Sequence, residues 1–160
     1  TSMLYARTKS RGWALIESDR PLTGISFVFA TGKGVNNFMA AVPVLSEKSA
    51  GLELPHVSSD KSWDTCFIIA NPDDDSQSVF IEVFSSAGDS MYSTDENIAG
   101  KGCREYCLSE LLPEKDLVGG KIKVSASEGV VAYALYSNIK SGARSFSGVN
   151  FMSPVSVSDR

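Results

Sequence analysis

The sequence predicts an all-β fold, an antiparallel β-sandwich with at most one short helix. Three observations predict it: helix signals are scarce, short apolar or alternating runs rich in β-branched and aromatic residues recur, and clusters of Gly, Pro, Asn, Asp and Ser separate these runs. Nine such runs are typical of a sandwich or barrel. A length of 160 residues suits one domain with a substantial core, so we take 1–160 as a single domain.

Each predicted strand is a run of this kind, bounded by turn residues. In chain order the predicted strands are Trp13–Glu17, Leu22–Phe29, Asn37–Val44, Asp64–Ala70, Ser78–Phe84, Met91–Thr94, Lys121–Ala126, Val130–Ser137 and Ser145–Met152. The segment Leu108–Leu112 has good helix formers and is stopped by Pro113, which predicts one or two helical turns. The glycine-rich loop Thr31-Gly32-Lys33-Gly34 leads into no helix, so it predicts a hairpin turn and not a phosphate site.

Composition narrows the possible partners. The net charge is −4, the pI is near 5.0 and the basic residues are scattered, which argues against nucleic-acid binding because phosphate contacts need clustered Lys and Arg. No apolar run approaches the roughly 18 residues that span a bilayer, so no membrane insertion is expected.

A possible internal repeat relates the two ends of the chain. Residues 12–22 align without a gap with residues 120–130, an offset of 108 (120 minus 12). Both copies read as strand, tight turn, apolar strand, glycine-containing loop and strand. The matched apolar pairs are Ile16 with Val124, Leu22 with Val130, Ile25 with Tyr133, Phe27 with Leu135 and Phe38 with Phe146. This predicts repeated units at 10–46 and 118–154 around an intervening segment at 52–112, although chance similarity between two β patterns is the alternative.

The second unit shows how such a repeat would build a core. Ile122 and Val124 share one face of their strand while Lys121 and Lys123 share the other, which predicts a half-buried strand. The run Val130–Tyr136 is apolar on both faces and is therefore expected to be a central strand.

The middle of the chain carries a more specific pattern. Its parts are Leu54-Pro55-His56-Val57, Trp63-Asp64-Thr65, Ile68-Ile69-Ala70-Asn71-Pro72, Gly100-Lys101-Gly102, Leu108–Leu112 and the segment from Gly120 onward. This pattern resembles an uncharacterised β-sandwich module common in exported bacterial proteins. The resemblance implies one copy from about 52 to 155, preceded by the second half of another at 10–46. It also implies a periplasmic or cell-surface location and no established catalytic activity. The sequence itself shows no cofactor signature, so no cofactor is expected.

Candidate site residues lie in this middle segment. His56 is the only histidine, but no strained nucleophile turn accompanies it, so we interpret it as a loop imidazole that pins the entry to the next strand. Trp63 could stack on a sugar ring with Asp64 accepting hydroxyl hydrogen bonds, although a tryptophan that closes a core is the commoner arrangement. These three residues form our candidate ligand-binding set.

A metal site is a weaker alternative. Asp73, Asp74 and Asp75 offer carboxylates that hard cations prefer, yet the loop lacks the spacing of a calcium loop, and a solvated turn is favoured.

The cysteines fit no standard metal or disulfide pattern. Cys66, Cys103 and Cys107 are too few and wrongly spaced for a zinc site or a disulfide scaffold. Cys66 is expected to be buried and inert in a strand. For Cys103 and Cys107 we favour free thiols over a local disulfide, and a metal site is the least favoured interpretation.

These observations predict a non-catalytic exported module that binds a glycan, a peptide or a partner domain, or that spaces other domains. The alternatives are a ligand-sensing domain of an envelope receptor and, less favoured, a hydrolase whose carboxylates come from loops.

Overall fold

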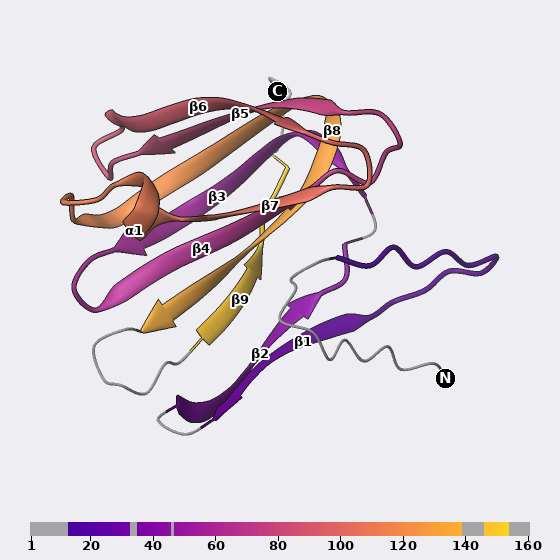
Figure 1. The fold of residues 1–160 in the computed structure, drawn as a ribbon, viewed down its shortest axis with the longest axis horizontal. Coiled ribbons are helices and arrows are strands. Elements are labelled where there is room, and N and C mark those ends of the chain that lie inside the picture. The colour runs from indigo at the N-terminus through magenta and orange to yellow at the C-terminus, as the bar shows by residue number, and fades with distance from the viewer. Residues whose placement is uncertain (1–12, 33–34, 46, 139–145, 154–160) are drawn as a thin grey trace, which may run out of the picture.

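The computed structural model describes residues 13–32, 35–45, 47–138 and 146–153 (Figure 1). Their regular elements are β1 (Ile25–Gly32), β2 (Val35–Pro43), β3 (Ser49–Ser59), β4 (Trp63–Ala70), β5 (Gln77–Phe84), β6 (Ser90–Ile98), β7 (Cys103–Cys107), α1 (Leu108–Leu111), β8 (Leu117–Asn138) and β9 (Phe146–Asn150). The pairings between these strands are antiparallel throughout. The predicted all-β class and the single short helix at Leu108 are confirmed.

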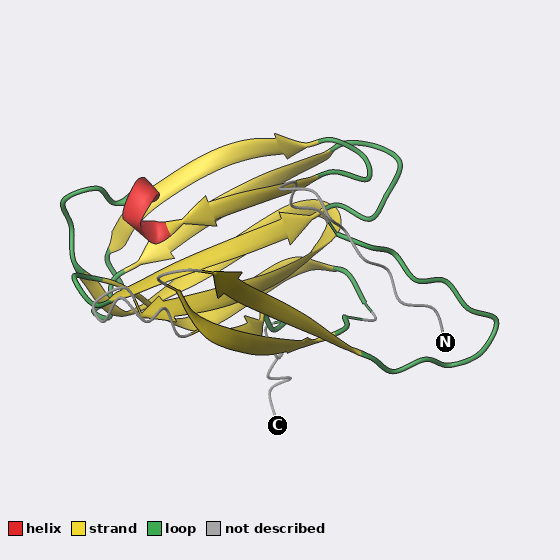
Figure 2. Cartoon of the chain, turned by 60° about the horizontal axis from the view of Figure 1, so that its bottom comes forward, coloured by secondary structure: helices red, strands yellow, loops and turns green. Residues whose placement is uncertain are grey.

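Two layers are built around one long strand, β8, which takes part in both (Figure 2). The first half of β8 pairs with β3 on one side and β5 on the other, and β5 pairs with β6. The second half of β8 pairs with β4 and β9, and β4 pairs with β7. The strand orders are therefore β6-β5-β8-β3 in one layer and β7-β4-β8-β9 in the other.

The core lies between these two layers, where alternate residues of each strand point inward. Val79, Ile81 and Val83 of β5 are fully buried, as are Phe67 and Ile69 of β4. These side chains belong to one hydrophobic cluster that spans both layers, which is the packing expected of a sandwich.

The largest difference from the sequence prediction concerns β8. Lys121–Ala126 and Val130–Ser137 were expected to form two strands joined by a tight turn, but they are parts of one 22-residue strand. Gly129 takes φ +127° in the middle of it, a conformation open to glycine, where the strand leaves one layer and enters the other. A glycine that signals a turn in sequence is here the bend of a continuous strand.

The prediction of a strand at Trp13–Glu17 is wrong. Residues 13–24 contain no regular element, because no neighbouring strand pairs with them within the described part of the chain. Two strands went unpredicted: β3, which contains Pro55 and Gly51, and β7, which is short and charged. The remaining predicted strands are present, with ends that differ by at most four residues.

β1 and β2 form a separate two-stranded sheet beside β9. Gly32 pairs with Val35, as the predicted hairpin turn requires. Lys33 and Gly34 of that turn lie outside the described residues, as do Gly12 and Ser145 of other predicted segments. A Cβ on Gly148 of β9 would clash with Cγ2 of Val42, so glycine permits the close approach of β9 to β2.

Candidate functional site

The structure brings two of the three predicted site residues into one hollow. His56 and Ser58 of β3, Trp63 of β4, Tyr136 of β8 and Val149 of β9 enclose a volume of about 480 Å³. We call this the aromatic hollow. It lies at the end of the sandwich where β3 ends, β4 begins and β8 ends, on the left of Figure 1.

Strand alternation positions the two large rings of the hollow. Thr65 is fully buried on the inner face of β4, so Trp63, two residues earlier, lies on the same face at the end of the core. Tyr136 pairs directly with Thr65 and therefore shares this face. Trp63 is 40% exposed, so part of its ring is open to solvent.

A strand irregularity positions His56. Leu54 and Val57 are both fully buried although they are three residues apart, an odd spacing that regular alternation would place on opposite faces. The register of β3 shifts between these two residues, which leaves Pro55 and His56 exposed outside the core. The imidazole of His56 lies 6.3 Å from the Tyr136 ring, centroid to centroid.

Hydrogen bonds hold the walls of the hollow in place. The Tyr136 hydroxyl donates to the carbonyl oxygen of His56. Thr65 ties β3 to β4, since its hydroxyl donates to the Ser58 carbonyl (2.8 Å) and accepts from the Ser58 N–H (3.1 Å). Burial raises the pKa of Tyr136, which extends to higher pH the range over which its hydroxyl stays protonated and can donate.

Asp64, the third predicted residue, is on the opposite face of β4 and does not line the hollow. Its carboxylate is buried beside α1, where it accepts hydrogen bonds from the Ser109 N–H (3.1 Å) and the Ser109 hydroxyl (2.6 Å). The side chain therefore satisfies a backbone donor at the start of the helix, which gives it a structural role.

We expect Asp64→Ala to lower the free energy of unfolding by about 1–2 kcal/mol, because it removes a cap from α1 and a charge-assisted hydrogen bond. Ser109→Ala is the matched control, since it removes the hydroxyl donor and keeps the backbone one, and its expected cost is smaller. Urea unfolding of the two variants measures both costs. An Asp64→Ala protein as stable as the parent would contradict the capping role.

The acidic loop is occupied by internal contacts. Asp73 accepts hydrogen bonds from Lys48 (2.6 Å) and from the Gln77 amide (3.0 Å), and Asp74 forms an ion pair with Lys101 at 3.4 Å. The three carboxylates of this loop do not form a cluster that could hold a metal ion. Asp73 is therefore partly buried and paired, whereas Asp74 and Asp75 are exposed.

The cysteine predictions need correction. Cys66 and Cys107 form a disulfide, whereas they were expected to be an inert core residue and a free thiol. The reason is the unpredicted strand β7, which places Cys107 directly opposite Cys66 on β4. Cys103 is free and half-buried. In the described part of the chain, the only group of three potential metal donors is Asp64 with these two bonded sulfurs, which are not thiolates and so are poor ligands.

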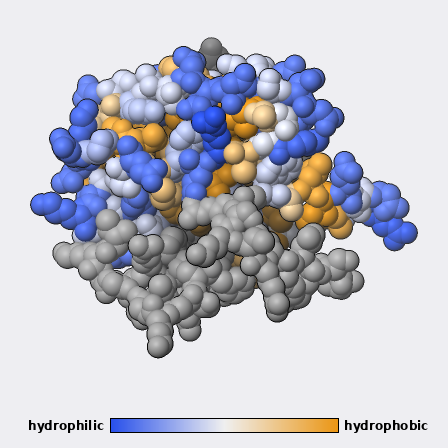
Figure 3. All heavy atoms as spheres, in the orientation of Figure 1, coloured by the Kyte–Doolittle hydropathy of each residue, from blue (hydrophilic) through white to orange (hydrophobic). Residues whose placement is uncertain are grey.

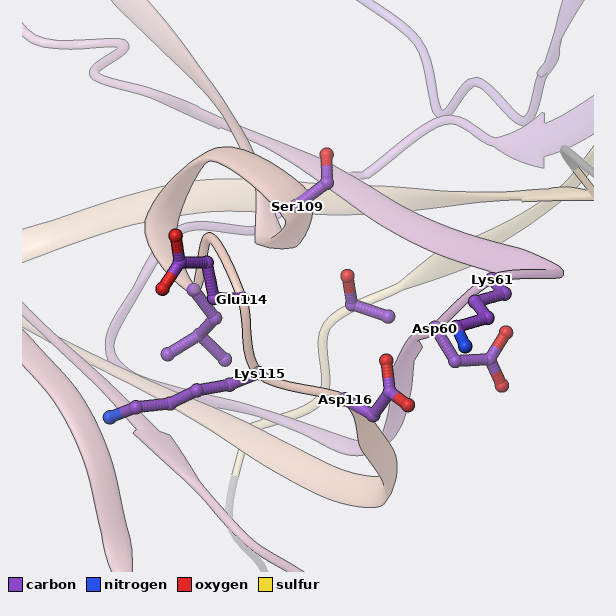
Figure 4. A pocket seen from close by; sticks show the side chains of 8 residues that line it. Asp60, Lys61, Ser109, Glu114, Lys115 and Asp116 are labelled. Carbon is purple, nitrogen blue, oxygen red and sulfur yellow. The ribbon is translucent and has the colours of Figure 1, made fainter.

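A second hollow of about 450 Å³ lies between the β3–β4 turn and the segment after α1 (Figure 4). Asp60, Glu114 and Asp116 line it together with Lys61 and Lys115. In Figure 4 the carboxylate of Glu114 is directed away from those of Asp60 and Asp116. One oxygen of Asp60 already accepts hydrogen bonds from the N–H groups of Ser62 (2.6 Å) and Trp63 (2.8 Å). The hydrolase alternative, which needs two facing carboxylates, stays a prediction for this hollow.

Sequence comparison identifies no relatives: no protein-family model and no curated protein matches the chain. Structure comparison finds a similar fold in the crystal structure of Thermotoga maritima 1070, with a TM-score of 0.58 and 10% identity over 67% of this chain and 96% of that one. The Anabaena sensory rhodopsin transducer gives a TM-score of 0.45 and 12% identity, over 56% of this chain and 97% of that one. The first similarity concerns the fold alone, and the second is too low to support an argument.

Among the described residues there is also no helix with the length and hydropathy needed to cross a membrane.

Proposed function

We propose that this chain is a non-catalytic binding module of an exported protein and that its aromatic hollow binds a glycan. The observation that carries the proposal is the half-exposed Trp63 ring, which stands beside Tyr136 and His56 in a pre-formed hollow. Its volume of about 480 Å³ lies within the range typical of small-molecule sites.

The chemistry of the lining suits a sugar. One face of a sugar ring is made of C–H groups and stacks on an exposed aromatic ring, here Trp63, while its hydroxyls need polar partners at the edge of the site. Ser58 and the imidazole of His56 supply such partners. The walls are rigid, because strand pairing and the Thr65 and Tyr136 hydrogen bonds hold them before any ligand arrives, and pre-organisation lowers the entropic cost of binding.

The Cys66–Cys107 disulfide supports export, since disulfides persist mainly in oxidising compartments such as the periplasm and the cell exterior. A glycan-binding role is consistent with that location. A ligand-sensing domain of an envelope receptor would use the same hollow, and it would differ from the present proposal in the domains attached to the module.

Glycan-array binding tests the proposal with a pair of tryptophan variants. Trp63→Ala is expected to weaken binding by about tenfold or more, because it removes the stacking surface, and tenfold corresponds to about 1.4 kcal/mol. Trp13→Ala is the matched control, since Trp13 lies outside the hollow and its indole N–H donates to the Lys101 carbonyl (3.0 Å). Equal loss in both variants, or the absence of any array signal for the parent protein, would contradict a glycan site at Trp63.

The hydrolase alternative is tested with the same glycans. Incubation with the parent protein is expected to return them intact by mass spectrometry. Cleavage that disappears in Asp60→Asn or Asp116→Asn would replace the binding proposal with catalysis at the second hollow.

A further inference from the structure

Asp64, Cys66 and Cys107 form a cluster of potential metal donors outside the aromatic hollow. One carboxylate oxygen and the two sulfurs all lie within 4.8 Å of one another. The cluster lies on β4 and β7 beside α1, on the left of Figure 1. While the two sulfurs are bonded to each other they are poor ligands, so the capacity of this cluster to hold a metal depends on the redox state of the protein.

The strand pairing brings these three side chains together. Asp64 and Cys66 are two residues apart on β4 and therefore share a face. Cys107 pairs directly with Cys66, with their Cα atoms 4.0 Å apart. Sγ of Cys66 lies 3.9 Å from Oδ2 of Asp64. Because the backbone pairing of β4 with β7 sets these positions, we expect the three side chains to stay together when the S–S bond is broken.

The arrangement suits a tetrahedral zinc ion. With Zn–S bonds of about 2.3 Å and Zn–O bonds of about 2.1 Å, neighbouring donor atoms of a tetrahedron are about 3.5–3.8 Å apart. The separation of 3.9 Å between Asp64 and Cys66 is close to this range. Once the bond is broken, rotation of the two cysteine side chains lets their sulfurs separate to the same distance. Two thiolates and one carboxylate are zinc ligands, and a water molecule can complete the tetrahedron.

Ser109 holds the carboxylate in a fixed orientation. Its N–H donates to Oδ1 of Asp64 (3.1 Å), and its hydroxyl donates to Oδ2 (2.6 Å). Carboxylates that ligate metals are typically oriented by hydrogen bonds of this kind. The position of Asp64 is therefore set before any metal arrives.

The cluster is also accessible to ions. Cys66 and Cys107 are each partly exposed, and Ser109 lines the second hollow (Figure 4). In Figure 3 the left end of the described surface, where Figure 1 places α1, is mostly hydrophilic. Hydrated ions thus have a path to the sulfurs.

We propose that the reduced protein binds Zn²⁺ through Asp64, Cys66 and Cys107. A dithiol reductant supplies two electrons and two protons to the S–S bond, which becomes two thiols, and the reductant is itself oxidised to a disulfide. Zn²⁺ then replaces the two thiol protons, which pass to solvent. The same side chains hold a disulfide in an oxidising compartment and a metal ion in a reducing one. This site is separate from the aromatic hollow and does not depend on its function.

Titration with Cd²⁺ and Zn²⁺ tests the site in the Cys103→Ala variant, whose only cysteines are Cys66 and Cys107. The protein is reduced with a phosphine and then separated from it without air. We expect the ultraviolet absorption of Cd²⁺–thiolate bonds to saturate at one Cd²⁺ per chain. Competition with a chelating dye should show Zn²⁺ binding at least about 100-fold tighter after reduction, because only thiolates are good sulfur ligands. A reduced protein without the Cd²⁺ band, or equal Zn²⁺ affinity before and after reduction, would overturn the proposal.

Asp64→Asn separates a three-ligand site from binding by the cysteines alone. Asparagine keeps an oxygen for the Ser109 donors but lacks the negative charge of a carboxylate, so we expect the Zn²⁺ affinity of the reduced protein to fall by about tenfold or more. Glu110→Gln is the matched control, because Glu110 is exposed on α1 and lies outside the cluster. It should leave the affinity unchanged. An Asp64→Asn protein that binds Zn²⁺ as tightly as its parent, or an equal loss in both variants, would show that the carboxylate is not a ligand and that the proposal is wrong.

Circular dichroism deals with the case in which reduction unfolds the chain. Zn²⁺ is then expected to restore the β-sheet signal, because an ion that binds only the folded state stabilises that state. The Asp64→Asn variant should need a higher Zn²⁺ concentration for the same recovery. A reduced chain that stays unfolded in excess Zn²⁺, or a variant that recovers at the same Zn²⁺ concentration as its parent, would contradict the site.

Discussion

Replacing Asn71 with alanine is expected to lower the free energy of unfolding by about 3–5 kcal/mol. The Asn71 side chain is fully buried where three connections meet. Its amide nitrogen donates to the carbonyls of Asp75 (2.8 Å), Ile98 (3.1 Å) and Ala99 (3.3 Å), and its oxygen accepts from the Asp73 N–H (3.0 Å). Alanine leaves these groups without that partner. The bond to Ile98 is buried and the other three are partly buried, and a buried polar group left unsatisfied costs about 1–3 kcal/mol.

Urea unfolding monitored by circular dichroism measures this effect. The expected loss is a large part of the stability of an ordinary domain, about 5–15 kcal/mol, so the variant should unfold at a much lower denaturant concentration. Asn97→Ala is the matched control, because Asn97 is exposed on β6 and its replacement is expected to change little. A loss below about 1 kcal/mol for Asn71→Ala would mean that the amide is not the structural tie described here.

Removing the Cys66–Cys107 disulfide is expected to cost up to about 4 kcal/mol. The bond joins residues 41 apart in sequence. In the unfolded chain it closes a loop of that length, and the lost conformational entropy corresponds to roughly this free energy. The double variant Cys66→Ala with Cys107→Ala should therefore have a lower unfolding midpoint. Cys66 and Cys107 lie on the neighbouring strands β4 and β7, whose backbone pairing does not depend on the bond. We therefore expect the variant to keep the fold.

A reducing agent gives an independent check on this disulfide. Reductant should lower the midpoint of the parent protein and leave that of the double variant unchanged. Cys103→Ala is the control, since Cys103 is free and its loss should preserve the response to reductant. A parent protein whose midpoint does not respond to reductant would contradict the bond.

Sequence reasoning located the strands whose own residues alternate clearly. β5 reads Gln-Ser-Val-Phe-Ile-Glu-Val-Phe, with Val79, Ile81 and Val83 on the inner face, and it was predicted to within one residue. β3 and β7 were missed for physical reasons. β3 carries Gly51 and Pro55, both disfavoured in strands, and an irregularity that breaks its alternation. β7 is a short edge strand with exposed charged residues, which has no apolar period to detect.

The residues of the candidate site were likewise predicted only in part from the sequence. Trp63 and His56 could be selected from sequence, but Tyr136 could not, because only the β4–β8 register places it beside them. Asp64 was grouped with Trp63 although adjacent strand residues point to opposite faces, and that alternation was a signal available to separate them. The Cys66–Cys107 bond depended on the pairing of β4 with the unpredicted β7.

The central claim is that the aromatic hollow binds a glycan without transforming it, and tryptophan fluorescence tests this most directly. The chain has two tryptophans, so Trp13→Phe leaves Trp63 as the only indole reporter. Titration of this variant with the strongest array glycan is expected to give a saturable change in Trp63 emission, with the glycan recovered chemically intact. Binding that leaves Trp63 emission unchanged, or recovery of a cleaved glycan, would contradict the claim.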